Sequence, residues 1–338
     1  METETISKNG RNPKSQTSRG NFLMFACVAF LSSFFMLSGC KKDNKNDGTD
    51  GPIYLLSEIE SSKKWTDKFE YDNKNRITKM TVYYDGDVRD VFTLIYNNAG
   101  DLTSIHYPEN NKTIMFSKNG NIITVTRSWW NEENGIRSEK IELNGQGLPS
   151  KITNETYENE SSWYKGSTTF KYQGKNITEV AYEFDEVDHG ETNTGGGKST
   201  ATYDDKKAPL YYCNTPEWFL IYWFSAECGI QNNVITVNDN DGNHIDTFDY
   251  TYNDAGFPLT EIMTHMQTWK DEDGNEQTDT WTYSETYKYV NSAGEEYTVA
   301  QNKASNLSNV GAMSQKREMN RSNGQAFGNM FGSRPSRK

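Results

Sequence analysis

A short unit that recurs along this chain of 338 residues constrains the fold more than any other feature. Its clearest copy, Tyr252 to Thr260, reads as the end of a strand, a tight turn and the start of a returning strand. Asparagine, aspartate and glycine in the middle of the unit suit the positive φ angles of hairpin turns. The unit therefore predicts hairpins and carries no chemistry of its own. Related copies begin at Tyr71, Tyr96 and Phe116, and weaker ones begin at Leu143, Tyr172, Tyr203 and Tyr289.

Residues between the units alternate with a period of two. Phe248, Tyr250 and Tyr252 are separated by polar Asp249 and Thr251, which places aromatic rings on one buried face of a strand. Each interval also holds a second turn, so we expect an all-β domain, an up-and-down antiparallel meander of about 14 to 16 strands. A sheet of this size should curve strongly or form an open barrel, because open twisted sheets rarely exceed ~10 strands. The second set of turns is predicted at Asp85–Gly86, 108–110, 133–135, Lys165–Gly166, His189–Gly190 and Asp273–Gly274.

One hydrophobic insert between Tyr203 and Tyr252 interrupts the repeats. Thr215 suits a helix N-cap, Pro216 suits the first helical position, and Gly229 suits the end of a helix. The segment 218–224 is apolar on every side, so we expect a buried helix with the curved sheet around it. A buried strand is the alternative. The run is too short to span a membrane.

The amino terminus has the features of an export signal. Basic residues precede a short apolar run that extends from Phe22 to Leu37, which is typical of a secretory signal peptide at residues 1–39. The residues Leu37 to Cys40 then resemble the lipobox of bacterial lipoproteins, which implies that Cys40 is lipidated and anchors the protein to a membrane. An uncleaved signal anchor is the alternative. Residues 40–52 are polar and are expected to form a flexible tether.

Charge and composition limit the remaining possibilities. The formal net charge is −12, and the acidic residues are concentrated between the signal and the basic tail, which argues against nucleic acid as a partner. Residues 53–300 are long enough for one β domain, and abundant aromatic residues favour strands. Residues 301–338 are polar and basic, and are expected to be disordered.

The repeated turns resemble the tyrosine–aspartate, or Rhs-type, repeats. The lipobox, the hairpins, the aromatic insert that follows residues 204–209, and the final copy at Tyr252 together resemble a Bacteroidota lipoprotein family of unknown function. The charged residues after Cys40 also resemble the export tags of surface lipoproteins in that phylum. This resemblance implies a fold and an outer-membrane, cell-surface location; an orientation toward the periplasm is the alternative. It implies no activity.

No motif of a known catalytic or metal site is evident. Residues 238–242 and 270–274 are acidic, but an EF-hand alignment on their glycines puts Val237 or Trp269 at the first ligand position, so both are interpreted as turns. The four histidines lack metal-ligand spacing. The acidic cluster at residues 185–189 is assigned to a mobile loop because of the glycines at 190 and 195–197. We therefore expect no metal, no cofactor and no enzymatic activity, with a glycan hydrolase as the least favoured function.

Two cysteines, Cys213 and Cys228, flank the predicted helix. A helix from Pro216 to Glu227 would span roughly 18 Å, whereas the Cα atoms of a disulfide lie within ~7 Å. A helix and a bridge between these cysteines are thus nearly exclusive. Because we favour the helix, we expect buried thiols.

Aromatic residues beside the second set of turns are the most suggestive functional feature. Neighbouring residues on a strand face opposite ways, so one member of each aromatic pair should leave the core. Such rings could stack on sugars, which favours a non-catalytic protein that binds a glycan or a protein. The alternative is a carrier of lipid or another apolar ligand, held against the hydrophobic insert. The candidate binding residues are Tyr84, Trp129, Trp130, Trp163, Tyr164 and Trp269.

Overall fold

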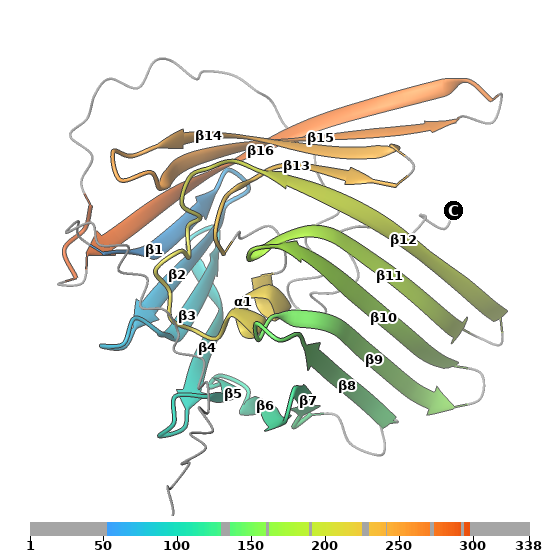
Figure 1. The fold of residues 1–338 in the computed structure, drawn as a ribbon, viewed down its shortest axis with the longest axis horizontal. Helices are drawn as coiled ribbons and strands as arrows, with labels where there is room; N and C mark the ends of the chain where they lie inside the picture. Colours follow the sequence, from blue (N-terminus) through green and yellow to red (C-terminus); the bar gives the residue numbers. More distant parts are fainter. Residues whose placement is uncertain are drawn as a thin grey trace, which may run out of the picture. The chain divides into compact units, whose positions relative to one another are not determined.

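The computed structural model describes residues 53–297, apart from 130–135, 160–161, 189–190, 225–229, 241, 271–273 and 292–293. Within these residues sixteen antiparallel strands form one barrel, in which each strand pairs with its neighbours in sequence (Figure 1). The strands are β1 (Tyr54–Ser61), β2 (Trp65–Tyr71), β3 (Ile77–Tyr84), β4 (Asp87–Tyr96), β5 (Leu102–Tyr107), β6 (Lys112–Asn119), β7 (Ile122–Arg127), β8 (Ile136–Leu143), β9 (Pro149–Asn159), β10 (Ser162–Gln173), β11 (Asn176–Asp188), β12 (Glu191–Tyr203), β13 (Val234–Asp239), β14 (His244–Tyr252), β15 (Pro258–Lys270) and β16 (Glu276–Asn291).

The all-β meander predicted from the repeats is confirmed, and the barrel is closed rather than open. Strand β1 pairs with β16 from Tyr54 opposite Asn291 to Ser61 opposite Glu285. This pairing joins the first and last strands of the meander and leaves neither of them as a free sheet edge. The predicted signal peptide, Cys40, the tether and the basic tail lie outside the described residues.

Five of the described turns share one geometry. In the copy at Asn97, the backbone N–H of Asn97 donates to Asp101 O at 3.0 Å, and the N–H of Gly100 donates to Asn97 O at 3.0 Å. The fourth residue has a positive φ, which is 91° at Gly100 and 59° at Asn75. Asparagine and glycine tolerate this conformation best, which explains the composition of the repeat. The five turns begin at Asp72, Asn97, Asn144, Asn253 and Asn291, and the barrel end that they occupy is called the repeat-turn end below.

Five tyrosines that begin copies of the unit, together with Tyr250, also have a structural role. Their hydroxyl groups donate to backbone carbonyl oxygens on other strands, with O–O distances of 2.6–2.9 Å. Each such bond satisfies a phenol that faces the barrel interior and ties one hairpin to another. The pairs are Tyr71 with Leu56, Tyr96 with Ile77, Tyr172 with Pro149, Tyr203 with Ile177, Tyr250 with Val234, and Tyr289 with Pro258.

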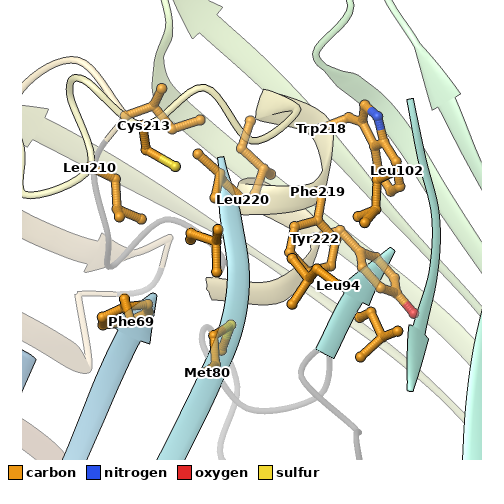
Figure 2. Close-up of a cluster of buried hydrophobic side chains, with 14 of the residues drawn as sticks. Phe69, Met80, Leu94, Leu102, Leu210, Cys213, Trp218, Phe219, Leu220 and Tyr222 are labelled. Atoms are coloured by element: carbon orange, nitrogen blue, oxygen red, sulfur yellow. The ribbon is translucent and has the colours of Figure 1, made fainter. Parts of the chain in front are cut away.

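The predicted buried helix is present as α1 (Glu217–Phe224). Its side chains from Trp218 to Tyr222 are all buried, and Phe219 is fully inaccessible. Figure 2 shows this helix among side chains from the barrel strands, including Leu94 and Met80. A helix that is apolar on all sides needs this kind of enclosure, because any exposed face would leave large aromatic rings in water.

The insert between β12 and β13 packs onto the repeat-turn end. Asn214 N–H donates to Asn75 O at 2.8 Å, and Lys207 N–H donates to Gly256 O at 3.1 Å. Thr215, which was expected to cap the helix, uses its hydroxyl to accept the backbone N–H of Ile77 at 2.8 Å. The insert therefore covers this end of the barrel and bonds to turns that are far apart in sequence.

The outer face of the barrel carries cross-strand ion pairs. Glu58 on β1 pairs with Lys68 on β2 at 3.1 Å, and also with Lys288 on β16. Glu179 on β11 pairs with Lys171 at 2.9 Å and with Lys198 at 2.6 Å. Core residues such as Ile59 and Val180 lie at the alternate positions and face inward. The outer wall thus presents charged groups to its surroundings.

Two predictions made from glycine residues are wrong. Gly166 was assigned to a turn, but it lies within β10, and residues 195–197, assigned to a mobile loop, lie within β12. The acidic residues 185–188 likewise belong to β11. Gly166 makes room for the ring of Tyr164 on its own strand, and Gly195 and Gly197 make room for rings on β11. The predicted turn at 189–190 falls outside the described residues, as do the one at 133–135 and Asp273 of the one at 273–274.

No helix among the described residues is long and apolar enough to cross a membrane.

Candidate functional site

The candidate aromatic residues lie toward the end of the barrel opposite the repeat-turn end, but they do not form one cluster. Tyr84 packs on Trp65 with ring centroids 4.7 Å apart. Trp129 packs edge-on against Tyr107 at 5.7 Å and is half-buried. Trp269 is 44% exposed. Trp163 and Tyr164 are half-buried, and Trp130 lies outside the described residues. No ring contact among the described residues joins two members of the predicted set.

A buried charged network connects helix α1 to the barrel wall. Tyr222 donates its hydroxyl to Glu139 Oε1 at 2.6 Å. Arg127 Nη2 donates to the other carboxylate oxygen of Glu139 and to the Tyr222 hydroxyl, both at 2.9 Å. The side chains of Arg127 and Glu139 are only 4% and 2% exposed. Hydrogen bonds to charged groups in such an environment are strong, and breaking one is costly.

A second guanidinium approaches the same carboxylate. Arg137 Nη2 lies 3.5 Å from Glu139 Oε2, and its side chain is 16% exposed. Burial and the nearby charge of Arg127 lower the pKa of Arg137, while Glu139 acts in the opposite direction. One buried carboxylate therefore faces two buried guanidinium groups.

Three aromatic rings lie flat against the backbone of the inner wall. A Cβ atom added at Gly195 would lie 2.6 Å from the ring of Phe184, and one at Gly197 would lie 2.7 Å from the ring of Tyr182. A Cβ atom at Gly166 would meet the ring of Tyr164. The glycines therefore leave the space that these rings occupy.

The rings of Tyr164 and Phe184 are stacked on each other, with centroids 6.2 Å apart and planes inclined by 16°. Both side chains are half-buried, as is Tyr182. Because these residues alternate with outward-facing residues such as Lys165 and Glu183, they belong to the inner face of the barrel. Their arrangement provides flat aromatic surface that remains in contact with solvent.

The charged network and the rings belong to one continuous surface. Strand pairing places Glu139 opposite Asn154, Asn154 opposite Gly166, and Gly166 opposite Phe184. Neighbouring strands lie about 4.8 Å apart, so β7 to β11 span roughly 19 Å of wall. We call this surface the β7–β11 wall, defined by Arg127, Arg137, Glu139, Asn154, Tyr164 and Phe184.

A second polar cluster lies on strands β13 to β16. His265 Nδ1 pairs with Asp246 Oδ1 at 2.5 Å, and His244 Nδ1 pairs with Asp239 Oδ2 at 2.8 Å. The two imidazole rings lie 5.9 Å apart, and His265 also packs on Trp281 at 3.9 Å. These histidines are isolated in the sequence because they lie on the two strands of one hairpin, His244 on β14 and His265 on β15. Pairing of the two strands brings the rings together.

No group of three metal-ligating side chains occurs among the described residues. Cys213 is buried, at 3% exposed, as expected. Its proposed counterpart Cys228 lies outside the described residues, so the redox state of this pair stays a prediction.

No family model and no curated protein matches this chain. Among solved structures, the chain resembles a porin-like protein from Bacteroides uniformis, with a TM-score of 0.32 and 15% identity over 69% of this chain and 96% of the other. It also resembles a porin-like protein from Bacteroides vulgatus, with a TM-score of 0.28 and 11% identity over 70% of this chain and 98% of the other. TM-scores of this size support no conclusion about function or location.

Sequence reasoning missed most of the β7–β11 wall. Of its six residues, only Tyr164 was selected from the sequence, as a member of a Trp–Tyr pair. Arg127 and Glu139 lie on different strands, β7 and β8, and neither belongs to a motif. The available signal was the alternation itself, because both residues fall on the apolar, inward face of their strands, where a charged residue is unusual.

Proposed function

We propose that this protein is a lipid-anchored, non-catalytic binding protein of the bacterial envelope, and that its barrel takes up a glycan on the β7–β11 wall. The observation that carries this proposal is the half-buried aromatic surface of Tyr164 and Phe184 beside polar Asn154. Sugars offer apolar C–H faces to aromatic rings and hydroxyl groups to polar side chains. A protein ligand at the same surface is the alternative within this class.

Charged groups on the outer wall favour a barrel that is surrounded by water and held to the membrane by lipid at Cys40. The lipid-facing side of a membrane barrel is an apolar band, and a Lys at its midplane costs about 2–4 kcal/mol. The pairs around Glu58 and Glu179 place several charged groups on that side. This favours a tethered barrel over one embedded in hydrocarbon.

Packing around α1 counts against the alternative of an apolar-ligand carrier. Such a ligand would lie where residues 218–224 meet the sheet, but Phe219, Leu220 and Ile221 are at most 1% exposed. The helix itself fills the position that a bound lipid would need.

Binding of the full-length protein, purified in detergent, to an array of neutral and acidic oligosaccharides tests the proposal. Phe184→Ala should lower retention of the bound members about two- to tenfold, since one stacked ring is worth about 0.5–1.5 kcal/mol beyond its buried area. Tyr83→Ala is the matched control, because that ring lies on the outer face beneath Lys68. Equal retention by both variants, or no retention by the wild type, would refute the proposal.

A further inference from the structure

One sector of the outer wall carries most of the exposed apolar side chains. Among the described residues six large apolar side chains are 39–47% exposed, and four of them lie on three strands: Val88 and Ile95 on β4, Met115 on β6, and Ile122 on β7. Ile95, Met115 and Ile122 each stand beside a buried residue of the same strand, so they face outward. Strands β4 to β7 are consecutive neighbours in the barrel (Figure 1). The exposed apolar groups are therefore concentrated in one place.

The same sector has no charged side chain at its outward positions. From Val91 to Ile95 on β4, and along the whole of β5, β6 and β7, these positions hold threonine, serine, asparagine, histidine, valine, isoleucine and methionine. Charged residues return on the flanking strands, at Lys79 on β3 and at Lys140 on β8. We call this sector, the outward-facing residues of β4 from Val91 onward and of β5 to β7, the neutral face.

The composition of the neutral face suits contact with a partner. Apolar side chains gain free energy when they leave water, and exposed apolar groups that gather on one face mark an interaction surface. Removing a charged group from water is costly unless the group is paired. Because the neutral face carries no such group, it can leave water at a lower cost than the ion-paired remainder of the outer wall.

Shape and charge favour a lipid surface over a second copy of the chain. The outside of a closed barrel is convex, so two neutral faces would meet along a narrow strip, whereas stable protein interfaces bury roughly 1,200–2,000 Å². Two chains with a formal net charge of −12 also repel each other. A lipid surface deforms around a convex wall, and its headgroup region accommodates hydroxyl groups as well as apolar side chains.

The lipid anchor proposed at Cys40 would keep the neutral face close to a bilayer. Strand β1 begins at Tyr54, which is 14 positions after Cys40, and a chain of that length spans at most about 50 Å. Contact between the anchored barrel and the bilayer is therefore intramolecular, with the high effective concentration of a short linker. A contact that would be weak for a free protein is then sufficient.

We propose that the neutral face is a lipid-contact surface, on which the anchored barrel rests with Ile95, Met115 and Ile122 in the headgroup region of the bilayer. This inference rests on the lipid anchor of the proposed function and adds the orientation of the barrel to it. Water surrounds the rest of the wall. The barrel axis runs along the membrane plane, so a ligand reaches the β7–β11 wall from the side.

Photolabelling from within the bilayer tests the inference. The full-length lipidated protein is placed in vesicles of phosphatidylethanolamine and phosphatidylglycerol that contain a phospholipid with a photoreactive diazirine near its headgroup, and mass spectrometry locates the label. We expect roughly five times more label on β4 to β7 than on β9 to β12, whose outward charges keep them in water. Met115→Glu should lower the label on β4 to β7 roughly threefold, because its carboxylate must stay hydrated and is repelled by lipid phosphates.

A matched variant separates loss of contact from a general effect of surface charge. Tyr157→Glu replaces another exposed apolar residue, which is 44% exposed on β9 and lies outside the neutral face; it should leave the label on β4 to β7 unchanged. Far-ultraviolet circular dichroism and the unfolding temperature report whether each variant is folded. If Met115→Glu does not fold, Ile95→Glu takes its place with the same expected loss of label.

Vesicle flotation and glycan retention distinguish this inference from the function on which it rests. Protein that floats with the vesicles but is labelled evenly around its outer wall, or not at all, would overturn the lipid contact and leave the anchor intact. Cross-links between copies through β4 to β7 that persist on dilution with lipid would overturn it in favour of a second copy. Protein that does not float would overturn both the contact and the anchor. Glycan retention should be the same in Met115→Glu and the wild type, because Met115 is not part of the β7–β11 wall.

Discussion

The hydroxyl of Tyr222 and the carboxylate of Glu139 are joined by a 2.6 Å hydrogen bond between the buried helix and the barrel wall. Both residues are at most 2% exposed, so water cannot replace either partner. The bond fixes α1 against β8. It also fixes the carboxylate to which Arg127 binds.

Removing that hydroxyl should destabilise the protein without changing its shape. Tyr222→Phe leaves Glu139 buried with one hydrogen bond fewer, and we expect a loss of about 1–3 kcal/mol in the free energy of unfolding. Urea denaturation followed by circular dichroism measures it. Tyr157→Phe, which removes a hydroxyl from a ring that is 44% exposed, should change stability by no more than ~0.5 kcal/mol. Equal effects of the two changes would contradict the role assigned to Tyr222.

A methyl group at Gly195 should displace the ring of Phe184. The new Cβ would lie 2.6 Å from that ring, so the ring must leave the wall, and we expect Gly195→Ala to cost about 1–3 kcal/mol and to weaken glycan retention. Gly145→Ala is the matched control, since no atom lies within 4 Å of its added Cβ. A wild-type melting temperature and wild-type retention for Gly195→Ala would show that the ring does not rest on this glycine.

The contact of Thr215 with β3 should hold the insert on the repeat-turn end. Thr215→Val keeps the shape of the side chain and leaves the buried N–H of Ile77 without its acceptor. We expect a loss of about 1–3 kcal/mol and faster amide exchange at Ile77. Exchange at Ile123, a buried residue of β7, serves as the internal reference. Unaltered exchange at Ile77 would mean that this bond does not form in solution.

Alkaline pH should unfold the protein through its buried tyrosines. Burial raises the pKa of Tyr107 to about 12, and burial, followed by the nearby Glu139, raises the pKa of Tyr222 well above its usual value. The folded state then keeps protons that the unfolded chain loses above pH ~10, so stability is fully present below that pH and falls as pH rises. The slope can reach about 1.4 kcal/mol per pH unit for each such tyrosine. Urea unfolding between pH 8 and pH 11.5 measures the slope; a flat profile would contradict the burial of these phenols.

Protease treatment of intact cells should cleave this protein and spare a periplasmic marker. That result follows from the proposed surface location and directs the ligand search toward extracellular glycans. Protection in intact cells that is lost after lysis would instead place the barrel in the periplasm. The marker protein controls for leakage, and the glycan-binding test applies in either compartment.

The repeats predicted the architecture well because the residues of each repeat determine the structure of its own turn. A turn such as Tyr96 to Asp101 contains its own positive-φ glycine and its own asparagine acceptor, so its structure follows from a few adjacent residues. The burial of α1 was likewise predictable, since seven successive apolar residues need enclosure. Closure of the barrel was not, because pairing of β1 with β16 depends on the summed twist of all the strands.

The β7–β11 wall was beyond sequence reasoning for the same physical reason. Its geometry depends on register between strands, and a shift of one residue would turn Arg127 to the outer face. Gly166 was interpreted as a turn residue and Gly195 as part of a mobile loop, because glycine in a strand is unfavourable on its own. Their role became clear only when the rings of Tyr164 and Phe184 were placed.

The barrel cannot close until β16 has been synthesised, because β16 is the partner of β1. Lys288 and Glu58, which pair across the closing strands, lie 230 positions apart in the chain. A nascent polypeptide that has not reached β16 exposes two unpaired sheet edges, and contacts over so long a separation form late in folding. Products that end before β16 should therefore associate through those edges and be removed by quality control, so a chain must extend at least through β16 before it can accumulate.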